Sequence, residues 1–245
     1  MNDVEYRGRA AYLQNADTLV VADLHVGRVA ASNVDAPLDE GADLVDRIAT
    51  HLDAVDPATF VVAGDVLHVH GSVPTGAVDV LEAIVRTAES AGTTPVFVTG
   101  NHDTLLDNLD IAGDPVVTDE YRLQDGTVVC HGHEEPGGAS DEEPDKVDTG
   151  ETTATGTTRY VVGHEHPAIR IEGARHACFL AGENVYRDAD VLVLPAFNRA
   201  ASGTLVNQLG DAMSSVVGRL DRYRPVVVGD EAYEFPPLSE FAAML

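Results

Sequence analysis

Three short apolar segments, each followed directly by polar residues, set the fold that this chain can adopt. Thr18–Ala22, Thr59–Ala63 and Pro95–Thr99 are rich in valine and other apolar residues, and each is only five residues long. Short apolar runs of this kind, ended by polar residues or glycine, are typical of buried β-strands. The first half of the chain is therefore predicted to contain three buried strands.

Two helical patterns lie between these strands. The first opens near Asp39-Glu40, and the second ends before Gly92. Their apolar residues recur at the spacing of one helix face: Leu44, Val45, Ile48 and Leu52 in the first, and Val78, Leu81, Val85 and Ala88 in the second. Alternating strands and helices predict an α/β fold in which helical crossovers join the strands of one sheet.

The second half of the chain is predicted to be mostly β. Gln124-Asp125-Gly126 separates two apolar runs, which indicates a hairpin. Further strand-like segments follow at Arg159–Val162, Ala168–Ile171, Ala177–Leu180, Val191–Leu194 and Pro225–Val228. The segment Glu134–Thr158 contains almost no apolar residues, so we expect an acidic, flexible loop within a single domain spanning residues 1–245.

Histidine, aspartate and asparagine gather at five predicted strand ends. The clusters are Asp23-Leu24-His25, Gly64-Asp65, Gly100-Asn101-His102-Asp103, His131-Gly132-His133 and Gly163-His164-Glu165-His166. Side chains that follow neighbouring strands of an α/β sheet converge on one crevice at the carboxyl ends of those strands. We therefore expect these residues to form one site.

The residue types at these strand ends favour a metal site. Imidazole nitrogens and carboxylate oxygens without thiolates suit Mn²⁺, Fe or Zn²⁺, and six or seven ligands suit two ions better than one. Taken singly, Asp23 and Asp65 could instead cap helices, and a lone His-x-His pair is often a surface feature. The joint occurrence of all five clusters at strand ends favours the metal site.

The ordered set of motifs resembles the calcineurin-like metallophosphoesterase superfamily. The resemblance runs from Asp23 to His166 and implies a four-layer α/β/β/α sandwich with two metal ions at the strand ends. It also implies roles for individual residues: Asp23, His25 and His166 on one ion, Asn101, His131 and His164 on the other, Asp65 bridging both, and His102 near the leaving oxygen with Asp103 orienting it.

Two further segments are similar to a smaller group within that superfamily. Asp23–Arg28 and Leu194–Asn198 resemble the small archaeal and bacterial phosphoesterases that include the ligase-associated DNA-repair nucleases. The resemblance implies hydrolysis of phosphodiester bonds by a hydroxide held between two divalent ions, most simply Mn²⁺, with DNA as one substrate. A nucleotide or metabolite phosphodiesterase or phosphomonoesterase is the alternative, and a non-catalytic metal-binding scaffold is a further one.

Several residues near the motifs have two interpretations. Arg28 is a candidate contact to a substrate phosphate, against an ordinary role on a helix surface. His68 and His70 are expected to be solvated loop residues rather than supports for the ligands, and Glu165 is expected to point away from the metals. His131 is preferred to His133 as a ligand because it follows its strand directly.

The charge balance of the chain predicts a salt-rich environment. Asp and Glu number 41 against 15 Lys and Arg, which gives a formal net charge of −26, and Lys146 is the only lysine. At molar salt the screening length falls to about 3 Å, so an acidic surface of this kind repels itself little. No run of basic residues is dense enough to bind a phosphate backbone by charge alone.

The remaining features predict a cytoplasmic protein. No apolar run approaches the ~18 residues that span a bilayer, and residues 1–5 do not resemble a secretory signal. Cys130 and Cys178 lie far apart and are expected to be reduced. The sequence leaves the oligomeric state open.

Overall fold

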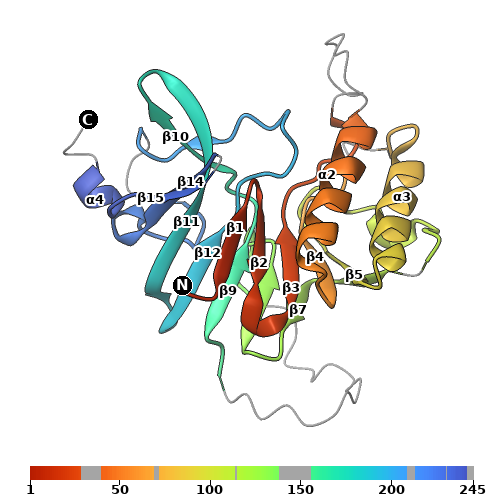
Figure 1. Cartoon of the computed structure of the whole chain (residues 1–245), viewed down its shortest axis with the longest axis horizontal. Helices are drawn as coiled ribbons and strands as arrows, with labels where there is room; N and C mark the ends of the chain where they lie inside the picture. The colour runs from red at the N-terminus through yellow and green to blue at the C-terminus, as the bar shows by residue number, and fades with distance from the viewer. Residues whose placement is uncertain are drawn as a thin grey trace.

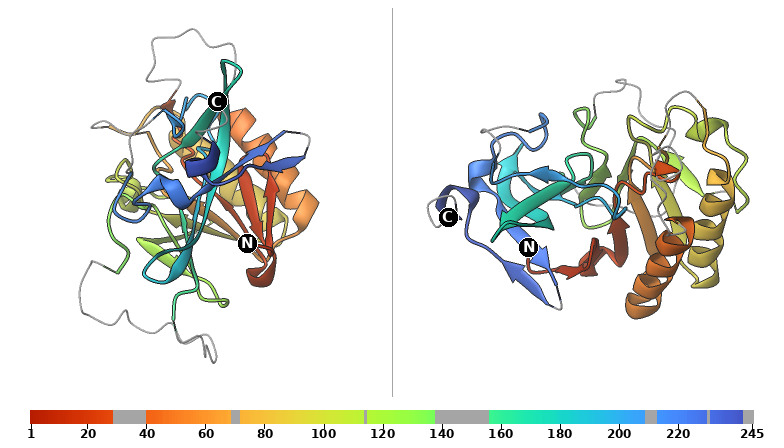
Figure 2. Two further views of the ribbon diagram at one scale, coloured as in Figure 1. Left: turned by 90° about the vertical axis from the view of Figure 1, so that its left-hand side faces the viewer. Right: turned by 90° about the horizontal axis from the view of Figure 1, so that it is seen from above.

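The computed structural model describes residues 1–28, 40–68, 72–113, 115–137, 156–208, 213–229 and 231–241. Two β-sheets lie face to face, with two long helices on the outer face of the first sheet (Figures 1 and 2). Most of the predicted acidic loop, His70 and Lys146 fall outside the described residues.

The first sheet has six strands in the order β1-β2-β3-β4-β5-β6. Their bounds are β1 Val4–Arg7, β2 Ala10–Leu13, β3 Thr18–Val21, β4 Thr59–Ala63, β5 Thr94–Val98 and β6 Val116–Thr118. Strands β3 to β6 are parallel, so their carboxyl ends meet at one edge. The short turns η1 (Gln14–Ala16) and η2 (Leu106–Asn108) connect parts of this half.

Helices α2 (Glu40–Val55) and α3 (Ala77–Ser90) confirm the two helical patterns of the sequence. Leu44, Ile48 and Leu52 of α2 are buried, as are Leu81 and Val85 of α3. These side chains pack on Leu19 and Val21 of β3 and on their counterparts in β4 and β5, which forms one hydrophobic core between helices and sheet.

The second sheet contains nine strands and confirms that the second half is mostly β. Its central path runs β13-β10-β11-β12-β9-β8-β7, with β14 beside β11 and β15 beside β14. The bounds are β7 Glu120–Arg122, β8 Thr127–Cys130, β9 Arg159–Val162, β10 Pro167–Ile171, β11 Ala174–Tyr186, β12 Ala189–Val193, β13 Thr204–Leu205, β14 Arg224–Val228 and β15 Ala232–Glu234. Strands β7 and β8 form the predicted hairpin, and β8, β9 and β12 run parallel.

A second core lies between the two sheets. Val20 of β3 and Val61 of β4 face away from the helices and pack with Val129, Val161 and Leu192 of the second sheet. The alternation along β3, with Leu19 and Val21 toward the helices and Val20 toward the second sheet, follows the two-residue period of a strand. Because the sheets share this core, the carboxyl ends of β3, β4, β5, β8 and β9 are held close together.

The outer face of the second sheet carries the fourth layer of the sandwich. Among the described residues this layer is thin: the turn η3 (Leu220–Arg222), the short helix α4 (Leu238–Phe241) and the segment around Val216 and Tyr223 cover Leu180 and Val191. In the described part of the chain, no helix is both long and apolar enough to cross a membrane.

Candidate metal centre

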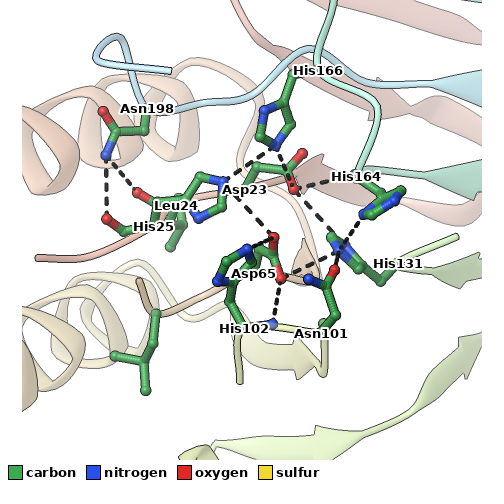
Figure 3. A network of polar contacts seen from close by, with 12 residues as sticks. Asp23, Leu24, His25, Asp65, Asn101, His102, His131, His164, His166 and Asn198 are labelled. Carbon is green, nitrogen blue, oxygen red and sulfur yellow. Dashed lines mark hydrogen bonds and ion pairs between the residues drawn. The ribbon is translucent and has the colours of Figure 1, made fainter. Parts of the chain in front are cut away.

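Loops from both sheets bring the predicted ligand residues together (Figure 3). Asp23 and His25 follow β3, Asp65 follows β4, and Asn101 follows β5, all in the first sheet. His131 follows β8 in the second sheet, and His164 and His166 follow β9. The site therefore lies at the seam between the two sheets.

Four residues form the first group of potential ligands. One ligand atom from each of Asp23, His25, Asp65 and His166 lies within 4.8 Å of the other three. His166 Nε2 is 3.1 Å from Asp23 Oδ1 and 3.2 Å from His25 Nε2, and His25 Nε2 is 3.8 Å from Asp65 Oδ2. Two imidazole nitrogens and two carboxylates thus face a common point.

A second group lies on the other side of Asp65. His131 Nε2 is 3.3 Å from Asp65 Oδ1, 3.1 Å from Asn101 Oδ1 and 3.3 Å from His164 Nδ1. Asp65 therefore offers one carboxylate oxygen to each group, Oδ2 toward His25 and Oδ1 toward His131. The Asp65 carboxylate therefore lies between the two groups of potential ligands.

An unpartnered buried atom shows that these residues fit metal ions. Asp23 Oδ2 is buried and has no hydrogen-bond partner among the described residues. A buried carboxylate oxygen without a donor is costly, and a cation offsets that cost. The donor set of imidazole, carboxylate and amide oxygen, without thiolate, suits borderline to hard divalent ions.

His131 has the environment of a metal-binding imidazole. Its Nδ1 lies 3.2 Å from the carbonyl oxygen of Ala63, which can only accept, so Nδ1 carries the proton and Nε2 is left for a metal. Gly64 makes this packing possible, because a Cβ there would lie 2.1 Å from His131 Nδ1. Gly100 has the same role beside Asp65, where a Cβ would lie 2.3 Å from Oδ1.

The backbone is strained at the candidate ligands. Five of them have positive φ: Asp23 (57°), His25 (45°), Asp65 (47°), His164 (64°) and His166 (45°). Non-glycine residues seldom adopt this conformation, which costs of order 1 kcal/mol or more per residue and collects at functional sites.

Burial and neighbouring charges change the pKa values of the candidate ligands in opposite directions. Burial lowers the pKa of His25 to about 4, so its imidazole is neutral at pH 7 and able to act as a ligand. Burial also disfavours charged His131, but its hydrogen bond with Asp65 and the negative charges of Asp23 and Asp65 raise its pKa to about 9. Burial raises the pKa of Asp65, yet the contact with His131 holds it well below its usual range. A cation at this position would take the place of the proton on His131.

Comparison with known proteins identifies the family of this chain. The family model for calcineurin-like phosphoesterases matches residues 17–168, a segment that contains all the candidate ligands. The chain belongs to the calcineurin-like phosphoesterase family. It is thus a metal-dependent hydrolase that acts on phosphate esters.

A solved structure shares the fold of this phosphoesterase. The crystal structure of Pseudomonas putida nuclease MPE aligns with a TM-score of 0.60 over 93% of this chain and 91% of that chain, at 21% sequence identity. No curated protein matches the sequence.

His102 and Asp103 of the phosphoesterase occupy different positions relative to the centre. His102 Nε2 is 3.9 Å from Asp65 Oδ2, and the His102 backbone N–H donates to Asp65 Oδ1 at 3.0 Å. The Asp103 carboxylate accepts hydrogen bonds from the backbone N–H groups of Val66, Leu67 and Gly100. These contacts let Asp103 connect the loops after β4 and β5, and its role in orienting His102 stays a prediction.

The remaining candidates lie around the edge of the centre. His68, expected to be a solvated loop residue, stacks on His102 with ring centroids 5.5 Å apart and lies 5.3 Å from the His25 ring. Arg28 is half-buried, and its positive charge is one of the influences that lower the pKa of His25. Glu165 accepts a hydrogen bond from the Ser214 backbone.

His133 is exposed, with its ring 5.2 Å from that of His131. Its position beside the second group follows from the His-x-His spacing, but the contacts with Asp65 and Asn101 belong to His131. The preference for His131 therefore agrees with the geometry.

Asn198 has a structural role that the sequence did not assign. Its buried side-chain amide donates to Leu24 O at 2.8 Å and to Glu40 Oε1 at 2.7 Å, and its backbone N–H donates to Asp23 O at 3.3 Å. Glu40 in turn accepts a hydrogen bond from Gly27 N. Asn198 thus fixes the loop that carries Asp23 and His25. The Leu194–Asn198 motif marked this segment in the sequence, but it did not predict which residues Asn198 contacts.

Proposed function

We propose that this phosphoesterase hydrolyses phosphodiester bonds of DNA with two divalent metal ions. The observation that carries the two-ion proposal is the orientation of Asp65, whose two carboxylate oxygens face two separate groups of ligands. The resemblance of Asp23–Arg28 and Leu194–Asn198 to repair nucleases supports DNA as the substrate, and so does the nuclease name of the structural neighbour.

The chain provides residues for both ions. Asp23, His25 and His166 would hold one ion, and Asn101, His131 and His164 the other, with Asp65 between them. Mn²⁺ suits this donor set, with Fe or Zn²⁺ as alternatives. When bound, two such ions neutralise the charge of a phosphate ester and lower the pKa of a water molecule that attacks phosphorus.

His102 is proposed to complete the reaction. Hydrolysis forms one P–O bond to the oxygen of water and breaks the ester P–O bond, so the departing oxygen needs a proton. The half-buried position of His102 beside Asp65 supports this role as proton donor. Arg28, at the rim of the centre, is proposed to contact a phosphate oxygen.

We also propose that residues 1–245 form one domain that works in a salt-rich cytoplasm. The shared core between the sheets supports the single domain. The excess of 41 acidic over 15 basic residues supports the salt-rich setting. Cys130 and Cys178, both buried and unpaired, fit a reducing compartment.

Hydrolysis of three substrates tests the function. Bis-p-nitrophenyl phosphate, p-nitrophenyl phosphate and single-stranded DNA are compared at high salt with Mn²⁺ and with a chelator. Chelator-sensitive cleavage of the diester and DNA is expected. Activity restricted to the monoester or the small diester would replace DNA with a nucleotide or metabolite substrate, and inactivity of metal-loaded protein on all three would indicate a scaffold.

A further inference from the structure

Arginines from four separate segments line two adjoining cavities beside the metal centre. The larger has a volume of about 460 Å³ and the smaller about 210 Å³. Arg9, Arg175 and Arg199 line both cavities, and Arg47 lines the larger one. We call this surface the arginine groove. The linear sequence shows no basic cluster, because these residues come from the β1–β2 turn, α2, β11 and the loop after β12.

The charge of this groove is opposite to that of the protein as a whole. The chain has 15 basic and 41 acidic residues, yet neither cavity is lined by an Asp or Glu within the part of the chain that the structure describes. Asp43 is shared by two of the arginines, at 3.0 Å from both Arg47 and Arg199. Among the described contacts of the four guanidinium groups, Asp43 is the carboxylate that offsets their charge, and it contacts only Arg47 and Arg199, so the groove is positively charged.

Arg9 and Arg175 hydrogen-bond to backbone carbonyls. Arg9 donates to Ala196 O and Asn198 O, and Arg175 donates to Ser202 O and Gly203 O. Carbonyl oxygens orient a guanidinium without cancelling its charge. Burial and the nearby charge of Arg199 lower the pKa of Arg9, which shows that these cations repel one another. An anion in the groove would relieve that repulsion.

One residue connects the groove with the candidate metal centre. His166, a candidate ligand, lines the smaller cavity, and the larger cavity extends from the shared arginines to His51, His176 and Val228. A ligand whose scissile phosphate lies at the metal centre can fill this groove favourably if it carries further negative charge beyond the cleaved bond. A phosphomonoester has no such extension, whereas a polynucleotide does.

We propose that the arginine groove binds the sugar–phosphate backbone of a polynucleotide strand on one side of the bond that is hydrolysed. The proposal rests on the proposed function, because it takes the metal centre as the place of cleavage. Guanidinium groups suit this role, since each presents a planar fork that matches two phosphate oxygens. Such hydrogen-bonded contacts retain part of their strength in salt that screens long-range attraction.

Arg199 allows a test with a closely matched control. Its side chain is 63% exposed and forms an ion pair with Asp43. Arg86 on α3 is 60% exposed and is paired with Glu82, but it does not line the groove. R199Q and R86Q therefore remove the same charge from similar surroundings. The double variant R175Q/R199Q removes a second cation. Arg9 and Arg47 are left intact because they donate to the carbonyl oxygens of Asn198 and Phe197, respectively.

Strand binding is measured on Mn²⁺-loaded protein with a labelled, hydrolysis-resistant phosphorothioate single strand over a series of salt concentrations. We expect R199Q to raise the Kd about 3–10-fold and to reduce the slope of log K against log salt by about 0.7, the value for one phosphate contact on a single strand. R175Q/R199Q should have a larger effect, and R86Q should bind as the wild type does.

Hydrolysis of bis-p-nitrophenyl phosphate separates the two proposals. If R199Q and R175Q/R199Q bind the strand as tightly as R86Q and the wild type do, the groove proposal is overturned. It is also overturned if the wild type does not bind the strand, even if the small diester is hydrolysed. Arginine-dependent strand binding without hydrolysis of the small diester leaves the groove standing and overturns the proposed function.

Discussion

Asp65 and His131 come from different sheets, yet His131 Nε2 lies 3.3 Å from Asp65 Oδ1. Asp65 follows β4 of the first sheet, and His131 follows β8 of the second. The candidate metal centre therefore depends on the packing of the two sheets against each other. This relationship makes Asp65 the most informative residue to change.

Asp65→Asn should abolish metal-dependent hydrolysis of bis-p-nitrophenyl phosphate while the fold is retained. The substitution keeps the shape of the side chain but removes the negative charge that faces both ligand groups. Metal content by elemental analysis and turnover are the measurements, with Asp107→Asn on the exposed turn η2 as the control. Unchanged turnover in Asp65→Asn would contradict the two-metal assignment.

His102→Ala should leave the metal content near that of the wild type and lower turnover by about 10²–10⁴-fold. The expectation follows from the position of His102, whose ring lies beside Asp65 but outside the two groups of proposed ligands. Turnover and metal content are measured on the same preparation. Loss of metal in this variant would show that His102 is a ligand rather than a proton donor.

Gly64→Ala should displace His131 and reduce metal binding. Gly64 has φ +81°, and an added Cβ would lie 2.1 Å from His131 Nδ1. Gly76 is the matched control, because it has φ +80° and no atom within 4 Å of an added Cβ. Both variants carry the backbone cost of roughly 1 kcal/mol, so a larger loss of stability and metal in Gly64→Ala isolates the clash. Equal behaviour of the two variants would mean that His131 can move without consequence.

Asn198→Ala should lower the free energy of unfolding by about 1–3 kcal/mol and weaken metal binding. The variant removes the donor that serves Leu24 O and the Glu40 carboxylate, and a buried acceptor left without a donor is costly. Urea unfolding and metal titration provide the two measurements. Full stability with weakened metal binding would restrict Asn198 to positioning the Asp23–His25 loop.

Because of His51, the free energy of unfolding should decrease as the pH falls from about 6.5 to 4. Burial, with the charges of Arg7 and Arg47, lowers the pKa of His51 to about 4 in the folded protein. The unfolded chain therefore binds a proton to this residue first, at its ordinary pKa near 6.5, and unfolding is favoured below that pH. His51→Gln should show a smaller difference in Tm between pH 7.5 and pH 4.5 than the wild type. An identical difference would assign the acid sensitivity to other groups.

The strands that carry the site were predictable because their sequence pattern is local. β3, β4 and β5 are short apolar runs with polar ends, and each is buried. β1 was not predicted, because Val4–Arg7 mixes charged and apolar residues and is only half-buried. β11 is longer than predicted. Its first residues, from Ala174, are exposed, its last residues up to Tyr186 are exposed or half-buried, and both ends pair with neighbouring strands.

The contacts that bring distant segments together could not be predicted from the sequence. Asn198 lies more than 150 residues from Leu24 and Glu40, so no spacing in the chain reveals their hydrogen bonds. The arginine groove is a similar case. Local patterns predict which residues follow a strand, whereas these contacts depend on how the sheets and loops pack.

The positive φ angles of the candidate ligands have a consequence for the history of the family. Asp23, His25, Asp65, His164 and His166 accept an unfavourable backbone conformation that glycine or asparagine would tolerate better. If these five residues hold metal ions, as proposed, metal binding would favour aspartate and histidine at these positions. In a descendant that had lost its catalytic role, these five positions should drift toward glycine and asparagine first. The residue types at these five positions would then distinguish active from inactive family members in a set of related genomes.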